Sequence, residues 1–248
     1  MWIVADGAPA GAPSVVPPVH KNRRGGLATT IRAVLVASGE ADSADVRWLA
    51  DADRVVAIDG GTAWLASVGR RPDLVVGDLD SADPALIAAL EADGVPIERH
   101  AVAKDASDTE LAVAGVLAAG ADEVVILGAL AGPRLDHQLA NLMLLADPEL
   151  SVVNDLRIVR GGTLVRVLHA GASLALEGMA GDLVTLLPIG GNAVGVRTAG
   201  LRYPLDGETL SIGRSRGLSN VVVQPPASVS LKGGSLLVVE TQQEGAAP

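Results

Sequence analysis

The feature that most constrains the fold is a regular alternation of apolar and helix-like segments between residue 33 and about residue 150. Three segments with helical character lie at 84–92, 108–119 and 135–145. Four apolar runs have the length and content of buried parallel strands: AVLVA (33–37), RVVAI (54–58), DLVVG (73–77) and EVVIL (123–127). This order is typical of βαβ units and predicts an open, mostly parallel α/β sheet.

Two of the expected helices have clear start signals. Asp83 stands directly before Pro84, which supplies a capping side chain and a proline at the first helical position. Ser107 and Glu110 have capping-box spacing ahead of the apolar residues of the next helix.

After about residue 155 the pattern changes to short alternating segments separated by Gly, Asn or Pro. These segments are TLVRVLH (163–169), ASLALE (172–177), DLVTLL (182–187), SNVVV (219–223) and SLLVVE (235–240). They predict a compact antiparallel β-sandwich or barrel. The expected organisation is a flexible extension over 1–31, rich in Ala, Gly and Pro, an α/β domain over 32–155 and a β-sandwich domain over 156–248.

Composition excludes several classes of function. The chain has no Cys, so disulfides, thiol nucleophiles and cysteine-bound metals are excluded. A net charge of −10, with no Phe and one Tyr, argues against nucleic-acid binding. No apolar run reaches the length of about 18 residues typical of a membrane span, and the first residues lack the order of a secretory signal. We therefore expect a cytoplasmic protein without a membrane segment.

Acidic and glycine-rich segments follow the apolar runs. They read DGG (59–61), GDLDS (77–81) and GALAGPRLDH (128–137), with KDASDTE (104–110) between the last two. In open α/β sheets ligands bind at the carboxyl ends of the strands, so these segments are expected to share one edge. Taken singly, each has a structural explanation: an Asp-x-Asp turn, or Ser107 as a helix cap. Their combination favours a site.

The chemistry of these segments suits a metal–phosphate site. Glycines let backbone N–H groups approach phosphate oxygens. Asp78 and Asp80, one residue apart in a loop, can both face a hard cation such as Mg²⁺, which prefers oxygen ligands. Neither a Walker A motif nor G-x-G-x-x-G is present. The residues alone therefore predict an α/β enzyme that binds metal and phosphate.

At these motifs the sequence resembles the thiamine pyrophosphokinase family. The resemblance spans about residues 33–240, with the motifs in the same order and at similar spacing. The matching pieces are DGG (59–61), PDLVVGDLDS (72–81), KDASDTELA (104–112), GALAGPRLDHQLANL (128–142), TAGLRYPL (198–205) and SRGLSN (215–220).

The resemblance implies a fold, an activity and an assembly. The fold is an α/β catalytic domain followed by a β-sandwich domain, and the assembly is a homodimer with active sites shared between subunits. The reaction moves the pyrophosphoryl group of ATP, with Mg²⁺ as cofactor, to the hydroxyl of thiamine and releases AMP.

The resemblance also implies roles for single residues. The expected Mg²⁺ ligands are Asp78, Asp80 and Asp108, which with Asp136 and Arg134 form the catalytic set. The expected ATP-binding residues are Asp59, Gly60, Gly61, Lys104, Ser107, Gly132 and Arg134. The expected thiamine-binding residues are Ser219, Asn220 and Tyr203, reaching across the dimer. Asp108 and Asp136 both remain candidates to accept the hydroxyl proton.

Two departures and three alternatives accompany this interpretation. The second half contains no Trp, and Tyr203 is its only aromatic residue, so stacking on thiamine would come from Tyr203 or be replaced by aliphatic contact. Pro133 precedes Arg134 where the family loop runs from glycine directly into Arg-x-Asp-His, which removes one backbone N–H. The alternatives are a pyrophosphokinase for another hydroxymethyl heterocycle such as a pterin, a non-catalytic thiamine or nucleotide sensor, and a structural protein. The GLRYPL (200–205) and GLSN (217–220) segments favour thiamine, and the four acids favour an enzyme.

Overall fold

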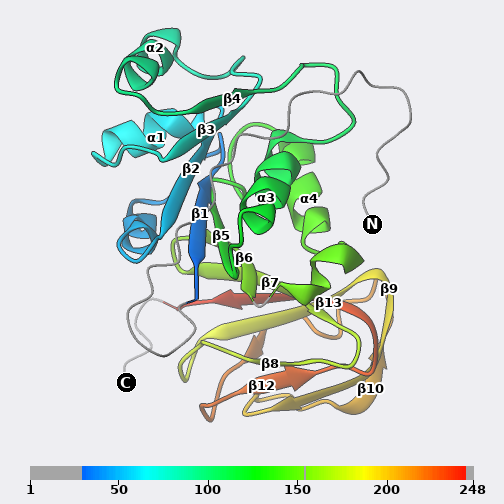
Figure 1. Ribbon diagram of the computed structural model, residues 1–248. Helices are drawn as coiled ribbons and strands as arrows, with labels where there is room; N and C mark the ends of the chain where they lie inside the picture. Colours follow the sequence, from blue (N-terminus) through cyan, green and yellow to red (C-terminus); the bar gives the residue numbers. More distant parts are fainter. Residues whose placement is uncertain (1–29, 154, 244–248) are drawn as a thin grey trace.

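The computed structural model of the chain describes residues 30–153 and 155–243 (Figure 1). Residues 1–29 of the expected extension therefore lie outside the described residues. Immediately before the first strand, Ile31 is buried and its backbone N–H donates a hydrogen bond to the Asp122 carboxylate.

The first half alternates strands and helices. In chain order its elements are β1 (Arg32–Val36), the 3-10 helix η1 (Ser43–Leu49), β2 (Arg54–Ile58), α1 (Gly61–Ser67), β3 (Leu74–Gly77), α2 (Pro84–Ala92), β4 (Ile97–Arg99), α3 (Asp108–Ala118), β5 (Glu123–Leu127), α4 (Leu135–Leu144) and the 3-10 helix η2 (Pro148–Val152).

The described part of the second half consists of strands. They are β6 (Asp155–Arg160), β7 (Thr163–His169), β8 (Ser173–Ala175), β9 (Leu183–Ala199), β10 (Asp206–Leu210), β11 (Asn220–Val221), β12 (Ser228–Ser230) and β13 (Gly233–Thr241).

The four apolar runs of the first half form strands, as predicted. Together with β4 and β6 they form one parallel array of six strands with the order β4-β3-β2-β1-β5-β6. Leu35 of β1 is in register with Val56 on one side and Ile126 on the other. β1 is therefore central, and the chain builds outward from it in both directions.

Helices cover both faces of this sheet because its strands are apolar on both sides. Leu35 shares a buried cluster with Val113 of α3, whereas its neighbour Val34 shares another with Leu65 of α1 and Ile87 of α2. Figure 1 shows α1 and α2 on one side of the sheet and α3 and α4 on the other.

The predicted helix starts are present. The Asp83 carboxylate accepts a hydrogen bond from the N–H of Ala85 at 2.9 Å, and Ser107 Oγ accepts one from the N–H of Glu110 at 3.2 Å. These caps satisfy backbone donors that a helix leaves free at its start. The second cap also fixes the loop before α3, which carries part of the candidate site.

The sheet is parallel only in part, so the molecule as a whole has a mixed sheet. β6 pairs antiparallel with β7, and β7 leads to β13 and β9, also antiparallel. The 17-residue strand β9 continues past β13 and also pairs with β12 and β10. The helix-covered sheet thus runs without a break into the strand-rich second half (Figure 1).

A buried ion pair ties the strands of the second half together. Arg166 of β7 pairs with Glu240 of β13, and both side chains are less than a tenth exposed. The other oxygen of Glu240 accepts hydrogen bonds from the backbone N–H groups of Glu177 and Gly178, at 2.6 and 2.9 Å. One carboxylate therefore joins two strands and the loop that precedes β9.

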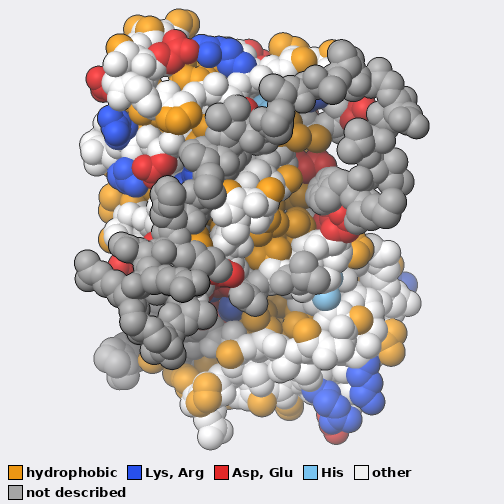
Figure 2. Space-filling model, in the orientation of Figure 1, with side chains coloured by type: hydrophobic (Ala, Val, Ile, Leu, Met, Phe, Trp, Pro, Cys, Tyr) orange, Lys and Arg blue, Asp and Glu red, His pale blue; other side chains and the backbone are white. Residues whose placement is uncertain are grey.

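The described surface gives no sign of a nucleic-acid interface on the face shown in Figure 2. Lys and Arg side chains there form small separate groups, mainly at the upper left and lower right, rather than one continuous patch. Among the described residues, no helix is both long enough and apolar enough to cross a membrane.

The buried ion pair predicts a specific loss of stability. Glu240→Ala should lower the free energy of unfolding by about 3 kcal/mol, because it leaves Arg166 and two backbone N–H groups without their carboxylate. Urea unfolding measures this change. Glu208→Ala is the matched control, since its ion pair with Arg216 is exposed, and should cost less than about 1 kcal/mol. Equal effects of the two substitutions would contradict the role given to Glu240.

Candidate functional site

The strand order creates a crevice at one edge of the sheet. β2 and β5 flank β1 on opposite sides, so the chain leaves the carboxyl ends of β1 and β5 in opposite directions. A cavity of about 690 Å³ lies at this edge. The segments that line it are 37–39 after β1, 58–59 after β2, 78–81 after β3, 107–109 at the start of α3, and 128–141 after β5.

Three carboxylates meet in this cavity. One oxygen from each of Asp59, Asp78 and Asp108 lies within 4.8 Å of the other two. Asp59 is buried, and the other two are partly buried. Close carboxylates with limited solvent are a donor set that suits a hard divalent cation such as Mg²⁺. The structure thus brings together two of the three expected metal ligands and adds Asp59, which the sequence assigned to ATP binding.

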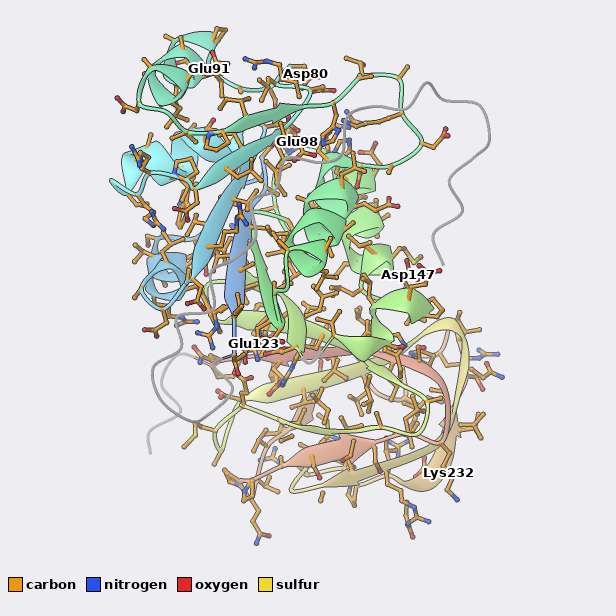
Figure 3. The ribbon with its side chains drawn as sticks, viewed as in Figure 1. Asp80, Glu91, Glu98, Glu123, Asp147 and Lys232 are labelled. Atoms are coloured by element: carbon orange, nitrogen blue, oxygen red, sulfur yellow. The ribbon has the colours of Figure 1, made fainter. Side chains whose placement is uncertain are left out.

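Asp80 takes a different place in the same cavity. It is exposed and lines the cavity but lies outside the three-carboxylate group. Its backbone N–H donates a hydrogen bond to Asp78 Oδ1 at 3.1 Å, so it orients that carboxylate. Figure 3 shows Asp80 at the end of the helical part that faces away from the strand-rich half.

Asp59 is held by an unusual local backbone. Its φ is 45°, in the left-handed region that is costly for a residue other than glycine. Its Oδ1 accepts a hydrogen bond from the N–H of Leu79 at 3.0 Å, and Leu79 also has a positive φ of 64°. A Cβ atom on Gly77 would lie 1.7 Å from Asp59 Oδ1, so only glycine fits there. The two loops are therefore interlocked by side-chain and backbone contacts.

The pKa of Asp59 reflects this environment. This pKa is raised to about 6, chiefly by burial; the Leu79 hydrogen bond and Lys104 oppose this shift, and the negative charges of Asp108 and Asp78 add to it. A raised pKa means that ionising the carboxylate costs free energy, and a nearby cation lowers this cost. This is the expected electrostatic state of a cation site.

The glycines of the DGG segment have packing roles. The N–H of Gly60 donates hydrogen bonds to Ser38 Oγ and Ser81 Oγ, at 3.1 and 3.3 Å. A Cβ on Gly61 would lie 1.9 Å from the carbonyl oxygen of Val36, so this glycine lets α1 approach β1. Gly60 thus holds two serines that line the cavity, and Gly61 sets the packing of α1 behind it.

The glycine-rich loop after β5 is fixed to α4. Gln138 Nε2 donates a hydrogen bond to the carbonyl of Gly132 at 3.0 Å, and Asn141 Nδ2 donates one to Ala129 at 3.2 Å. Gly132 has a φ of 116°, a conformation that favours glycine. The sequence analysis missed the roles of Gln138 and Asn141, although their positions three residues apart on one helix face next to the loop were a usable signal.

Arg134 and Asp136 form a two-point ion pair at the mouth of the cavity. Arg134 Nε and Nη2 lie 2.9 and 2.5 Å from the two oxygens of Asp136. Both side chains are about two-thirds exposed. The hydrogen bonds and charge of Arg134 hold the pKa of Asp136 well below its usual range. Asp136 is therefore a weak proton acceptor while this pair is intact.

Lys104 and Ser107 lie beside the carboxylates. Lys104 Nζ forms an ion pair with Asp108, and both side chains are mostly buried. Ser107 lines the cavity and caps α3 with its hydroxyl. Ser38 and Gly39 also line the cavity but were not predicted. They follow the first apolar run, so the rule that sites lie after strands applied to them as well.

The residues expected to bind thiamine lie together, but not at this cavity. Asn220 Oδ1 accepts a hydrogen bond from the N–H of Tyr203 at 3.0 Å, and Nδ2 donates one to the Tyr203 carbonyl at 2.8 Å. Ser219 has a positive φ of 54°, and the Tyr203 residue is 55% exposed. The residues that line the cavity lie between 37 and 141. The buried Asn220 side chain therefore holds the 198–205 turn.

Comparisons with known proteins match both halves of the chain. The family model described as "Thiamin pyrophosphokinase, catalytic domain" matches residues 46–159. The model described as "Thiamin pyrophosphokinase, vitamin B1 binding domain" matches residues 174–236.

Relatives and solved structures agree with these matches. Thiamine pyrophosphokinase 3 of Oryza sativa subsp. japonica is 28% identical over 177 residues, which cover 68% of this chain and 65% of that protein. Thiamine pyrophosphokinase of Bacillus subtilis is 22% identical over 186 residues, which cover 75% and 86%. The chain thus spans just under two thirds of the rice relative.

The solved structures match in fold. A crystal structure of the Bacillus subtilis thiamine pyrophosphokinase has a TM-score of 0.76 at 22% identity, covering 86% of this chain and 99% of that one. Yeast thiamin pyrophosphokinase has a TM-score of 0.70 at 16% identity, covering 90% and 89%.

The raised pKa of Asp59 predicts a pH-dependent effect of Asp59→Asn. The folded-state pKa of about 6 lies above the unfolded value of about 4, so the stability that the carboxyl contributes is present below pH 4 and lost as the pH rises through 6. Without metal, the free energy of unfolding of Asp59→Asn should equal that of the unsubstituted protein near pH 4. Near pH 7.5 it should be higher by about 2 kcal/mol.

Urea unfolding in a chelator at the two pH values measures this difference. Asp83→Asn is a control, because it makes the same change of side chain, but Asp83 caps α2 and lies outside the carboxylate group. A stability difference for Asp59→Asn that is the same at both pH values would show that burial does not raise its pKa.

Proposed function

This chain belongs to the thiamine pyrophosphokinase family, and we propose that it transfers the pyrophosphoryl group of ATP to the hydroxyl of thiamine, giving thiamine diphosphate and AMP. The observation that carries this proposal is the three-carboxylate group. It lies in the cavity at the carboxyl ends of β1 and β5, where the chain leaves the two strands in opposite directions. A polyphosphate substrate needs compensating positive charge, and this group is suited to hold a cation that supplies it.

We propose Mg²⁺ as that cation. Three carboxylate oxygens within 4.8 Å of one another are hard donors, and Mg²⁺ commonly binds to a few such groups while keeping several waters. Asp78 and Asp108 would bind it as the sequence analysis expected, and Asp59 would join them. Asp80, the third expected ligand, lines the same cavity outside the three-carboxylate group and would add negative charge near the ion.

The remaining residues in and next to the cavity would bind ATP. The loop around Gly132 and the guanidinium of Arg134 face the same space as the carboxylates. We propose that Arg134 turns from Asp136 to phosphate oxygens, since both offer the paired acceptors that a guanidinium prefers. Ser107 and Lys104 stand at the start of α3, where helix N–H groups favour anions. Asp59, which lines the cavity, and the adjacent Gly60 and Gly61 would complete the ATP site.

The chemical step follows from these positions. The thiamine oxygen attacks the β-phosphorus of ATP, the bond between that phosphorus and the bridging oxygen to the α-phosphorus breaks, and AMP leaves with that oxygen. Bound Mg²⁺ would supply positive charge to the phosphate oxygens. Arg134 would bind the oxygens on which charge builds up. Asp108, in the carboxylate group, or Asp136, once Arg134 has turned from it to the phosphates, would accept the hydroxyl proton.

We further propose a homodimer in which one subunit completes the site of the other. The cavity is lined by residues of the first half, whereas Tyr203 and Ser219 lie elsewhere in the same chain. Leu135, Leu139 and Met143 are 65, 51 and 62% exposed and lie four residues apart, so they form one apolar face of α4 beside the cavity. A second subunit would cover this face and bring its own Tyr203 and Ser219 to the cavity.

Packing supports two domains, as expected, but we propose a boundary slightly later in the chain than the expected one between 155 and 156. The third buried cluster takes all of its residues from 168 onward, whereas the clusters on the two sheet faces are built mainly from the first half. Strand β6, which begins at Asp155, pairs with β5 and extends the sheet of the first half. The boundary would therefore fall at the turn after β6.

The first test of the proposed function is a direct product assay. Purified protein with ATP, Mg²⁺ and thiamine should form thiamine diphosphate and AMP in equal amounts, detected by chromatography. A chelator should abolish both products, and Asp78→Asn should reduce the rate at least 100-fold, roughly the scale set by losing one electrostatic group at a reacting centre. AMP formed with a pterin acceptor but not with thiamine would exclude thiamine as the substrate.

The shared site predicts recovery of activity on mixing two variants. Asp78→Asn and Tyr203→Ala place their defects in different halves, so a mixed dimer has one intact site and one that carries both changes. With random exchange half of the dimers are mixed, and about a quarter of the unsubstituted activity should return at low thiamine. An activity no higher than the average of the two separate variants, with mixed dimers demonstrated by mass spectrometry, would contradict the shared site.

A further inference from the structure

Lys104 neutralises part of the carboxylate group from inside the protein. Its Nζ forms an ion pair with Asp108, and the Lys104 and Asp108 side chains are only 17 and 15% exposed. Its positive charge also acts on Asp59. The three close carboxylates that line the cavity therefore have one ammonium group beside them.

The ammonium group offsets a repulsion that the fold itself creates. Asp59 is fixed by the Leu79 hydrogen bond and by contact with Gly77, so it has little room to move away from its neighbours. Like charges at this separation in a partly buried site repel strongly. A cation near Asp108 lowers this repulsion, and Lys104 provides one when no metal is bound.

Lys104 is also placed to move. It lies in a segment, residues 101–107, that belongs to no helix or strand, and Ser107 caps α3 after it. A shift of the Lys104 side chain therefore breaks no bond of the helix or of the sheet. Its long flexible stem and compact charge suit an exchange between two anionic partners.

We propose that Lys104 is an internal counter-ion that holds Asp108 while the metal is absent and releases it to the metal, after which the ammonium binds the phosphates of the nucleotide. The inference rests on the proposed function, because it takes the cavity to be the metal–nucleotide site. Under this proposal Lys104 competes with the metal for Asp108 before the nucleotide binds. Afterwards Lys104 and the metal both bind the nucleotide phosphates.

This exchange predicts that Lys104→Met has opposite effects on metal binding in the absence and in the presence of nucleotide. Without nucleotide, Lys104→Met removes the competitor, so Mn²⁺ used in place of Mg²⁺ should bind roughly three to ten times more tightly. With a non-hydrolysable ATP analogue the same variant should bind the metal–nucleotide complex more weakly. If Lys104 only supported the loop, its loss would weaken binding both of Mn²⁺ alone and of the metal–nucleotide complex, because the carboxylates would become disordered.

The experiment measures Mn²⁺ binding to the full chain by electron paramagnetic resonance, first alone and then with the analogue. Lys232→Met is the matched control: it makes the same change of side chain and charge, but Lys232 is exposed and lies in the strand-rich half, away from Asp80 (Figure 3). Lys104→Arg keeps the charge and should retain the unsubstituted affinity for Mn²⁺. Circular dichroism verifies that each variant folds.

The outcomes separate this proposal from the proposed function. Tighter Mn²⁺ binding by Lys104→Met, with no change in Lys232→Met, supports the counter-ion even if thiamine proves not to be the acceptor. Unchanged or weaker Mn²⁺ binding in a folded Lys104→Met protein overturns the counter-ion, whether or not thiamine diphosphate is formed. If Lys104→Met does not fold, Lys104→Gln takes its place with the same expected sign.

Discussion

The parallel pairing of β1 with both β2 and β5 is the constraint on which the rest of the structure depends. It places the carboxyl ends of the neighbouring strands at one edge and sends the chain away from β1 and β5 in opposite directions. The loops after the strands separate there, and the space between them is the candidate site. Apolar side chains on both faces of the sheet hold this arrangement and leave only its edge for polar chemistry.

A site that gathers negative charge must be held together by the surrounding structure. Asp59 meets Asp78 and Asp108 because its backbone adopts a left-handed conformation and because Gly77 leaves room for its carboxylate. The raised pKa of Asp59 is the electrostatic consequence. Positive φ values at Asp59, Leu79 and Ser219 fall within the motifs that the sequence analysis selected, as is common where function requires a costly backbone.

Much of the framework could be predicted because its signals are local. The runs at 54–58 and 123–127 coincide with β2 and β5, and the Asp83-Pro84 pair marks the start of α2. The three-residue β4 and the short α1 were missed because neither has an apolar repeat or a capping side chain. β6 was missed because it lies where the sequence changes from one pattern to the other.

The edge of the sheet that carries the site could also be predicted, but its inner geometry could not. The sequence places Asp78 and Asp80 as equals, whereas the carboxylate group contains Asp59 in place of Asp80. That difference depends on two backbone dihedral angles and one missing Cβ atom, which no residue pattern encodes directly. The internal hydrogen bonds of Asn220 depend likewise on a turn whose residues are 17 positions away.

The position of β13 in the sheet affects how the chain can fold while it is being synthesised. This strand, residues 233–241, lies between β7 and β9 in the sheet, although both of those strands precede it in the chain. While the ribosome is still producing the chain, β7 and β9 are present with the edges that face β13 unpaired. Such edges attract other strands, so the nascent chain is open to wrong pairing until its last described strand arrives. The second half is thus completed by insertion into its middle rather than by growth at one side.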